Sequence, residues 1–266
     1  MDQGQALYDA GRYAEAIASW QESFTLAKRQ DDIDGQAIAH NYLAIGYQAL
    51  SQWHDAQQSI DRGFNLLASP NEPNHYFLYA QLLTTQGNGQ LQTGQTEAAL
   101  ASWQQAETLY QTVDATEQLT KVRINQTQAL RTLGFYRQAK DTLEEINHQL
   151  GALPDSLIKL RVSQNLGQTL YRVGDLAQAK TVLTEGVELA QRLDLPQEIA
   201  SLQLYLAQTT AALGEPDQAL SLYQQVQQSE ESSLALNANL YKLSLETKQQ
   251  DPEWSQITSD LSSLYS

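Results

Sequence analysis

The sequence predicts an all-α fold, a right-handed α-solenoid built from stacked antiparallel helix hairpins. Three observations support this prediction. Ala, Leu and Gln are abundant while Pro occurs only 6 times in 266 residues, a composition that favours helices. A short motif recurs at an almost constant interval, and most of the 14 Gly follow the same interval. Hydrophobic residues make up 41% of the chain, which argues against a wholly disordered protein.

The repeated motif reads Gly-x-Φ-x-x-Ala, where Φ is a large side chain, or a near relative of this pattern. It begins at Gly11, Ser51, Gly94, Gly134, Gly174 and Gly214. The closing alanines stand at positions 16, 56, 99, 139, 179 and 219, which are 40, 43, 40, 40 and 40 residues apart. Such a regular interval is the signature of a repeat architecture.

Two further positions keep the register of the closing alanine. A large residue follows it by four: Trp20, Ile60, Trp103, Leu143, Leu183 and Tyr223. A small residue precedes it by twelve: Gly4, Ala44, Gly87, Thr127, Gly167 and Ala207. Small side chains on both helices of a hairpin let the backbones approach closely, and the large side chain fills the next gap.

The pattern places the helices in order along one solenoid, residues 1–266, with breaks between repeats near 32, 72, 114, 154, 195 and 230. We predict six helix pairs and a terminal pair. Their ranges are 2–10/13–30, 34–50/53–68, 74–92/96–112, 115–132/136–150, 155–172/176–193, 196–212/216–228 and 231–248/252–265. A glycine before the second helix ends the first helix in a left-handed turn, and Pro216 stands in a first helical turn.

These repeats resemble the tetratricopeptide repeat family along the whole chain, although the interval is 40 residues instead of the family's usual length of about 34. The long repeats are similar to those of kinesin light chain. They resemble more closely the repeats that precede the caspase-like CHAT domain of cyanobacterial proteins, as in GQTEAAL at 94–100 and LRTLG at 130–134. That resemblance implies a protease-like domain using His and Cys; this chain has no Cys, so such chemistry cannot reside here.

A polar stripe on the first helices predicts a binding groove, because a solenoid lines its concave face with these helices. The fourth repeat carries Lys121, Asn125 and Gln128, and the fifth carries Arg161, Asn165 and Gln168 at an offset of 40. An asparagine amide both donates to and accepts from a peptide backbone, and a cation one turn away can pair with a carboxylate. The resemblance implies that Asn125 and Asn165 hold peptide backbones. The candidate groove residues are Lys121, Asn125, Gln128, Arg131, Arg161, Asn165, Gln168, Arg172 and Tyr205. An ordinary solvated helix face is the alternative.

Charge and exposure add two expectations. The net charge of −15 disfavours nucleic acid as a partner, although residues 121–180 hold nine basic and five acidic residues. Ile38, Tyr42 and Ile45 in the second repeat would form an apolar contact patch, unless the partial first repeat covers them.

The sequence therefore favours a scaffold that binds a peptide or a partner domain in its groove, including a CHAT domain on the same or another chain. We expect no enzymatic activity and no cofactor, and four scattered histidines argue against a metal site. The alternative is a structural array that self-associates through apolar end repeats at Leu7, Tyr8, Leu261 and Leu264. No membrane-spanning run is present, and we expect a cytoplasmic location, with an extracytoplasmic one left open. Met1 opens inside a repeat, so a missing N-terminal segment is a further expectation.

Overall fold

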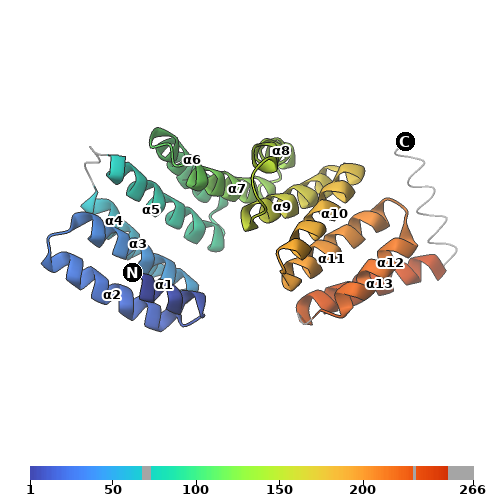
Figure 1. The fold of residues 1–266 in the computed structure, drawn as a ribbon, viewed down its shortest axis with the longest axis horizontal. Helices are drawn as coiled ribbons and strands as arrows, with labels where there is room; N and C mark the ends of the chain where they lie inside the picture. The colour runs from blue at the N-terminus through green and yellow to red at the C-terminus, as the bar shows by residue number, and fades with distance from the viewer. Residues whose placement is uncertain (68–72, 230–231, 251–266) are drawn as a thin grey trace. The chain divides into compact units, whose positions relative to one another are not determined.

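The computed structural model describes residues 1–67, 73–229 and 232–250, and in these ranges it holds helices and no strand (Figure 1). The first seven helices are α1 (Asp2–Asp9), α2 (Tyr13–Arg29), α3 (Ile33–Ala49), α4 (Trp53–Leu66), α5 (Pro73–Gln92), α6 (Thr96–Thr112) and α7 (Thr116–Thr132). The remaining helices are α8 (Tyr136–Gly151), α9 (Leu157–Val173), α10 (Leu176–Arg192), α11 (Pro196–Ala212), α12 (Pro216–Gln227) and α13 (Ser232–Gln250). The predicted helix ranges agree with these bounds to within two residues, and the predicted helix 252–265 lies outside the described residues.

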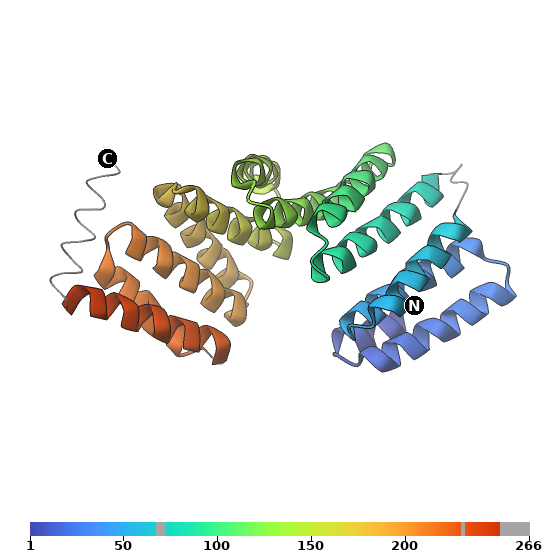
Figure 2. The same ribbon diagram turned by 180° about the vertical axis from the view of Figure 1, so that it is seen from behind.

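The chain divides into two compact units, Met1–Phe135 and Tyr136–Ser266, here called unit 1 and unit 2. In unit 1 the hairpins α1/α2, α3/α4 and α5/α6 stack in order, and α7 packs on α6 (Figures 1 and 2). In unit 2, α8 packs on α9, the hairpins α9/α10 and α11/α12 follow, and α13 packs on both α11 and α12. The predicted hairpin 115–132/136–150 and the single solenoid stay predictions, because they extend over both units.

The turn inside each predicted hairpin has the left-handed conformation that the motif requires. Gly11, Gly94, Gly134, Gly174 and Gly214 have φ between 73 and 84°, and Ser51 takes the same region with φ of 57°. In each turn the amide of the residue after the left-handed one reaches back to the first helix, as from Gln95 to the carbonyl of Gln90 at 2.8 Å. These bonds satisfy carbonyl groups that the end of a helix leaves without a partner.

The three register positions form the core. All six closing alanines are at most 2% exposed, and so are the six large residues that follow them. The small residues that precede them are buried as well. Gly87 and Gly167 pack directly against Trp103 and Leu183, because a Cβ on either glycine would lie 2.4 or 2.5 Å from that side chain. The small–large pairing predicted from the interval is therefore the packing inside these hairpins.

Candidate functional site

Unit 1 carries a groove of about 320 Å³ on its first helices. Six of its lining positions belong to the polar stripe and its counterparts in neighbouring repeats. The lining residues are Tyr8 from α1, Ile45, Gln48 and Ala49 from α3, Asn88, Leu91 and Gln92 from α5, Trp103 from α6, and Asn125 and Gln128 from α7. The groove therefore crosses four successive first helices inside one compact unit.

Buried polar contacts fix α3 against α5 beneath this groove. The Thr85 hydroxyl donates to the Asn41 side-chain oxygen at 2.6 Å, and the Gln48 amide donates to the Thr85 carbonyl at 2.8 Å. A Cβ on Gly89 would lie 2.6 Å from the Gln48 amide nitrogen, so glycine leaves room for this second bond. Because all three polar side chains are less than 9% exposed, their partners hold the two helices in one register.

The next pair of first helices is joined by two asparagines. Asn125 on α7 donates from its side-chain nitrogen to the side-chain oxygen of Asn88 on α5 at 3.3 Å. Both side chains are half-buried and line the groove. Asn125 thus takes part in a contact between helices, which leaves it one amide hydrogen and an acceptor oxygen for other partners.

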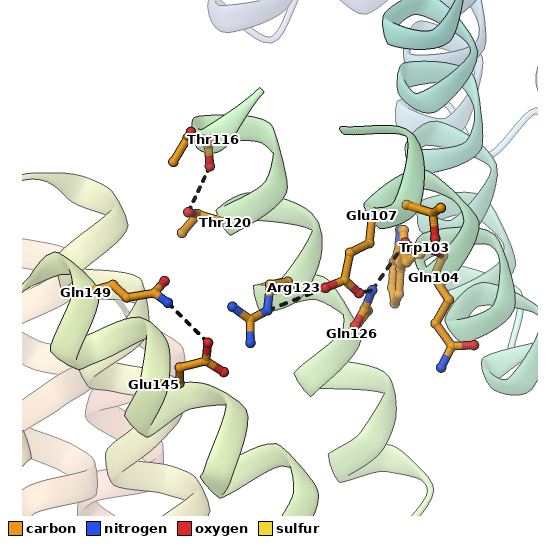
Figure 3. Close-up of polar contacts among 10 residues, drawn as sticks. Trp103, Gln104, Glu107, Thr116, Thr120, Arg123, Gln126, Glu145 and Gln149 are labelled. Atoms are coloured by element: carbon orange, nitrogen blue, oxygen red, sulfur yellow. Dashed lines mark hydrogen bonds and ion pairs between the residues drawn. The ribbon is translucent and has the colours of Figure 1, made fainter. Parts of the chain in front are cut away.

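A third set of contacts holds α7 on α6 (Figure 3). The Gln126 amide donates to the Trp103 carbonyl at 3.2 Å and to a Glu107 carboxylate oxygen at 2.7 Å. The other Glu107 oxygen lies 3.6 Å from the Arg123 guanidinium. Since these side chains are buried or largely shielded, they position the groove residues that α7 supplies.

The groove lining is electrically neutral. None of the ten lining residues is an Asp, Glu, Lys, Arg or His. Lys121, which the sequence placed in the candidate groove, is outside the lining and pairs with Glu117 at 2.6 Å. The Lys121 ammonium hydrogen-bonds that carboxylate and holds the pKa of Glu117 below its usual value. Arg131, also in α7, is half-buried and outside the lining.

The candidate residues of unit 2 have a different environment. Asn165 donates to the Arg161 carbonyl of its own helix at 2.9 Å, and its counterpart Asn125 donates to Asn88 on another helix. Arg161 and Arg172 are exposed, and Gln168 is half-buried. Tyr205 packs against the apolar cluster of Leu183 and Leu202, so its ring contributes to the core of unit 2.

The basic residues between 121 and 180 are largely engaged in intramolecular contacts. Lys140 lies 3.7 Å from Asp175, and Lys180 pairs with Glu215 in the same way one repeat later. Lys159 donates to the carbonyls of Gly151 and Leu153. These cations join successive repeats of unit 2, which reduces the positive charge that a nucleic acid could meet.

Two other expectations can be compared with the structure. Ile38, Tyr42 and Ile45 are half-buried, and Tyr42 stacks on Trp20 with ring centroids 5.2 Å apart. Of the three, Tyr42 is covered by the first repeat, Ile38 packs against the cluster of Leu78 and Leu82, and Ile45 lines the groove, so they form no single exposed patch. Among the described residues, no three His, Asp or Glu side chains come together as metal ligands.

Sequence reasoning missed four groove residues: Trp103, which the motif assigns to the core, and Tyr8, Gln48 and Leu91. Tyr8, Gln48 and Leu91 occupy one register position in successive repeats, with separations of 40 and 43 residues. The signal was thus present in the interval, but these three residues stand one position before the register of the polar stripe, so a search confined to that stripe did not include them. In the part of the chain that the structure describes, no helix is long and apolar enough to cross a membrane.

Comparison with known proteins agrees with this fold. Residues 200–225, in α11 and α12, match the family model described as a tetratricopeptide repeat. The structure is similar to BtubC (BKLC) from P. vanneervenii, with a TM-score of 0.71 and 15% identity over 80% of this chain and 89% of that one. It is also similar to a signal transduction ATPase with numerous domains from Pyrococcus horikoshii, which has a tetratricopeptide repeat sensor. There the TM-score is 0.80 and the identity 13%, over 94% of this chain and 38% of that one.

Pseudomonas aeruginosa PilF gives a TM-score of 0.61 and 16% identity over 91% of this chain and 95% of its own. No curated protein sequence gives a significant match. Likeness at such low identity defines the fold class and nothing finer. The prediction of an all-α fold of stacked helix hairpins is confirmed within each unit, and the single solenoid over both units stays a prediction.

Proposed function

We propose that this protein is an interaction scaffold that holds an extended segment of a partner protein in the groove of unit 1. The observation that carries the proposal is the groove itself, where amides from α5 and α7 lie beside the apolar side chains of α1 and α3. Amide side chains pair with a peptide backbone whatever its sequence, and apolar walls add contact area. The polar contacts beneath the groove hold this surface in one conformation, which lowers the entropy cost of binding.

The experiment is a selection of displayed random dodecapeptides on three forms of the chain. Ala49 lines the groove, so Ala49→Trp would fill part of it with an indole. Ala101 is exposed on α6 outside the lining, so Ala101→Trp is the matched control. We expect the wild type and Ala101→Trp to enrich the same peptides and Ala49→Trp to lose them. Equal enrichment on all three proteins, or none on the wild type, would exclude the groove as the binding site.

A narrower form of the proposal concerns the partner. The resemblance of the repeats to those that precede CHAT domains favours a caspase-like domain, on the same chain or on another. Such a domain would present an extended loop or terminus to the groove, and any thiol chemistry would belong to the partner. Titrating a purified CHAT domain with the wild-type chain and with Ala49→Trp tests this form. We expect the CHAT domain to bind the wild-type chain and to bind the Ala49→Trp variant more weakly.

Self-association through an end repeat is a second candidate function, and α13 favours it. Leu236, Leu240 and Leu243 on α13 are each more than half exposed. Counted from the start of each helix, Leu240 and Leu243 in α13 correspond to Leu204 and Ala207 in α11. In α11 these two positions pack against Ala219 and Tyr223 on α12. The exposed leucines of α13 therefore form a surface on which another helix can pack, and a second copy of the chain would supply that helix.

Light scattering of the wild type and of Leu240→Glu distinguishes this candidate. A dimer in the wild type that the charge converts to a monomer would support self-association, and a monomer in both would exclude it. At the other end of the array, Leu7 and Tyr8 pack beside Trp20 and are half-buried. Leu261 and Leu264, which the sequence also assigns to an open end, lie outside the described residues.

A further inference from the structure

We infer that the groove of unit 1 selects an uncharged partner segment, with an apolar side chain against Tyr8, Ile45 and Leu91 and one peptide group on Asn88 and Asn125. This inference rests on the proposed function, because it specifies the ligand of the same groove. It departs from the expectation drawn from sequence, in which Lys121 and Arg161 would recognise a carboxylate.

The apolar part of the groove is built mainly by the first two repeats. α1 and α3 contribute Tyr8, Ile45 and Ala49, with Gln48 as their one polar residue in the lining. The Tyr8 ring is held by aromatic neighbours, with its centroid 5.1 Å from that of Tyr13 and 6.0 Å from that of Trp20. A fixed aromatic wall beside branched aliphatic side chains suits an apolar anchor residue of the ligand.

Gln48 itself contributes little hydrogen bonding to a ligand. Its amide nitrogen already donates to the Thr85 carbonyl, and the side chain is only 8% exposed. The polar residue of this part of the groove is therefore engaged by the scaffold. A ligand meets mainly hydrocarbon between α1 and α3, which is unfavourable for a charged or strongly polar side chain.

The asparagine pair provides the main-chain contact. The bond from Asn125 to Asn88 orients both amides, because it uses one hydrogen of Asn125 and the oxygen of Asn88. The Asn88 nitrogen and the Asn125 oxygen have no hydrogen-bond partner among the described residues. One donor and one acceptor side by side match the carbonyl and the N–H of a peptide group. If the nitrogen and oxygen of both amides are exchanged, Asn88 donates to Asn125 instead. The pair then still presents one donor and one acceptor to the peptide group.

The absence of charged side chains from the groove lining also favours an uncharged ligand. The lining holds no ionic side chain, and the ammonium of Lys121 is already paired with Glu117. A ligand carboxylate would thus lose water without gaining a counter-ion, and the net charge of −15 would repel it further. A ligand ammonium would find no carboxylate in the lining either. A partner segment without charged side chains avoids the cost of desolvating either a carboxylate or an ammonium group.

The composition of the selected dodecapeptides is the first test. We expect the peptides that Ala49→Trp loses to share an apolar position flanked by uncharged residues. Their binding should change less than about twofold between roughly 50 and 500 mM salt, because no ion pair is screened. Groove-dependent peptides with a conserved Asp, Glu, Lys or Arg would overturn the inference and leave the proposed function intact. The absence of groove-dependent peptides would overturn both.

Two pairs of variants test the two contacts with a fluorescent form of the best selected peptide. Ile45→Glu places a charge in the lining, and Ile33→Glu places one at an exposed position of the same helix. Asn125→Leu removes the acceptor of the asparagine pair, and Asn237→Leu changes an exposed asparagine of unit 2. We expect Ile45→Glu and Asn125→Leu each to weaken binding about tenfold, and the two controls to leave it unchanged. Unchanged binding in either groove variant, with melting curves confirming the fold, would overturn the inference.

Discussion

The indole of Trp103 occupies the space in which a side chain on Gly87 would begin. A Cβ built on Gly87 would lie 2.4 Å from the indole nitrogen, well inside the closest approach of non-bonded atoms. That nitrogen donates to the carbonyl of Thr84, three residues before the glycine, at 3.2 Å. The first repeat has the same close packing sixteen residues apart, where a Cβ on Gly4 would lie 2.2 Å from the Trp20 nitrogen, but that nitrogen has no hydrogen-bond partner among the described residues. The tryptophan thus defines how closely two helices of a hairpin approach.

Replacing Gly87 by alanine should destabilise unit 1. The added methyl group would overlap the indole ring, and because Trp103 is 1% exposed the ring cannot move aside without disturbing its neighbours. Overpacking of this kind costs about 1–3 kcal/mol. Urea unfolding of the full chain measures the change. Gly151→Ala is the matched control, since a Cβ there has nothing within 4 Å, and it should leave stability unchanged or slightly raised.

The contact between Gln48 and Thr85 should depend on Gly89. Gly89→Ala would push the Gln48 amide away from the Thr85 carbonyl, and Gln48→Ala would delete the same bond. Each variant should lose about 1 kcal/mol from this bond, in addition to any packing change. The double variant should lose clearly less than the sum, because the interaction can be removed only once. Strictly additive losses in the unfolding free energy would show that Gly89 serves another purpose.

Burial of His40 should make the stability of unit 1 fall in mild acid. His40 is 5% exposed beside the Phe24 ring, and burial with the nearby Arg62 charge lowers its pKa from 6.5 to about 4. Between these two values the unfolded chain holds more protons than the folded one, so stability is complete above pH 6.5 and decreases as the pH falls toward 4. The slope is at most about 1.4 kcal/mol per pH unit.

The variant His40→Leu isolates this contribution, since both proteins share every other titrating group. Urea unfolding at several pH values between 4 and 7 should give a flatter dependence for the variant than for the wild type. Parallel curves would mean that His40 titrates alike in the folded and unfolded states. The absolute loss caused by the leucine is irrelevant to the comparison.

Much of the fold follows from the interval of the motif. The closing alanines, the small residues twelve before them and the large residues four after them are buried, because packing between two antiparallel helices depends on side-chain volume at fixed register. The left-handed turn at Ser51 was equally predictable from its position in the motif. Asp31, Asp114 and Asp194, which take positive φ between hairpins, were not predicted, since no motif marks those turns.

The candidate site was predicted less completely. The interval identifies Asn125 and Asn165 as equivalent positions, but it does not predict the bond from Asn125 to Asn88 on the neighbouring first helix. Such contacts join residues about one repeat apart, and they depend on the exact rotation of one hairpin on the next. Side-chain periodicity gives the face of a helix and leaves this rotation undetermined. The sequence also placed Lys121 in the groove, whereas its ammonium pairs with Glu117 one turn earlier on the same helix.

The central claim is that the groove of unit 1 holds the partner, and photo-cross-linking tests it most directly. A benzophenone amino acid would replace Gln92, an exposed lining residue, or Gln104, an exposed residue of α6 outside the lining. Each protein would then be irradiated with the labelled selected peptide. The account predicts a cross-linked product from position 92 and none from position 104. Cross-linking from position 104 alone, or equally from both, would contradict it.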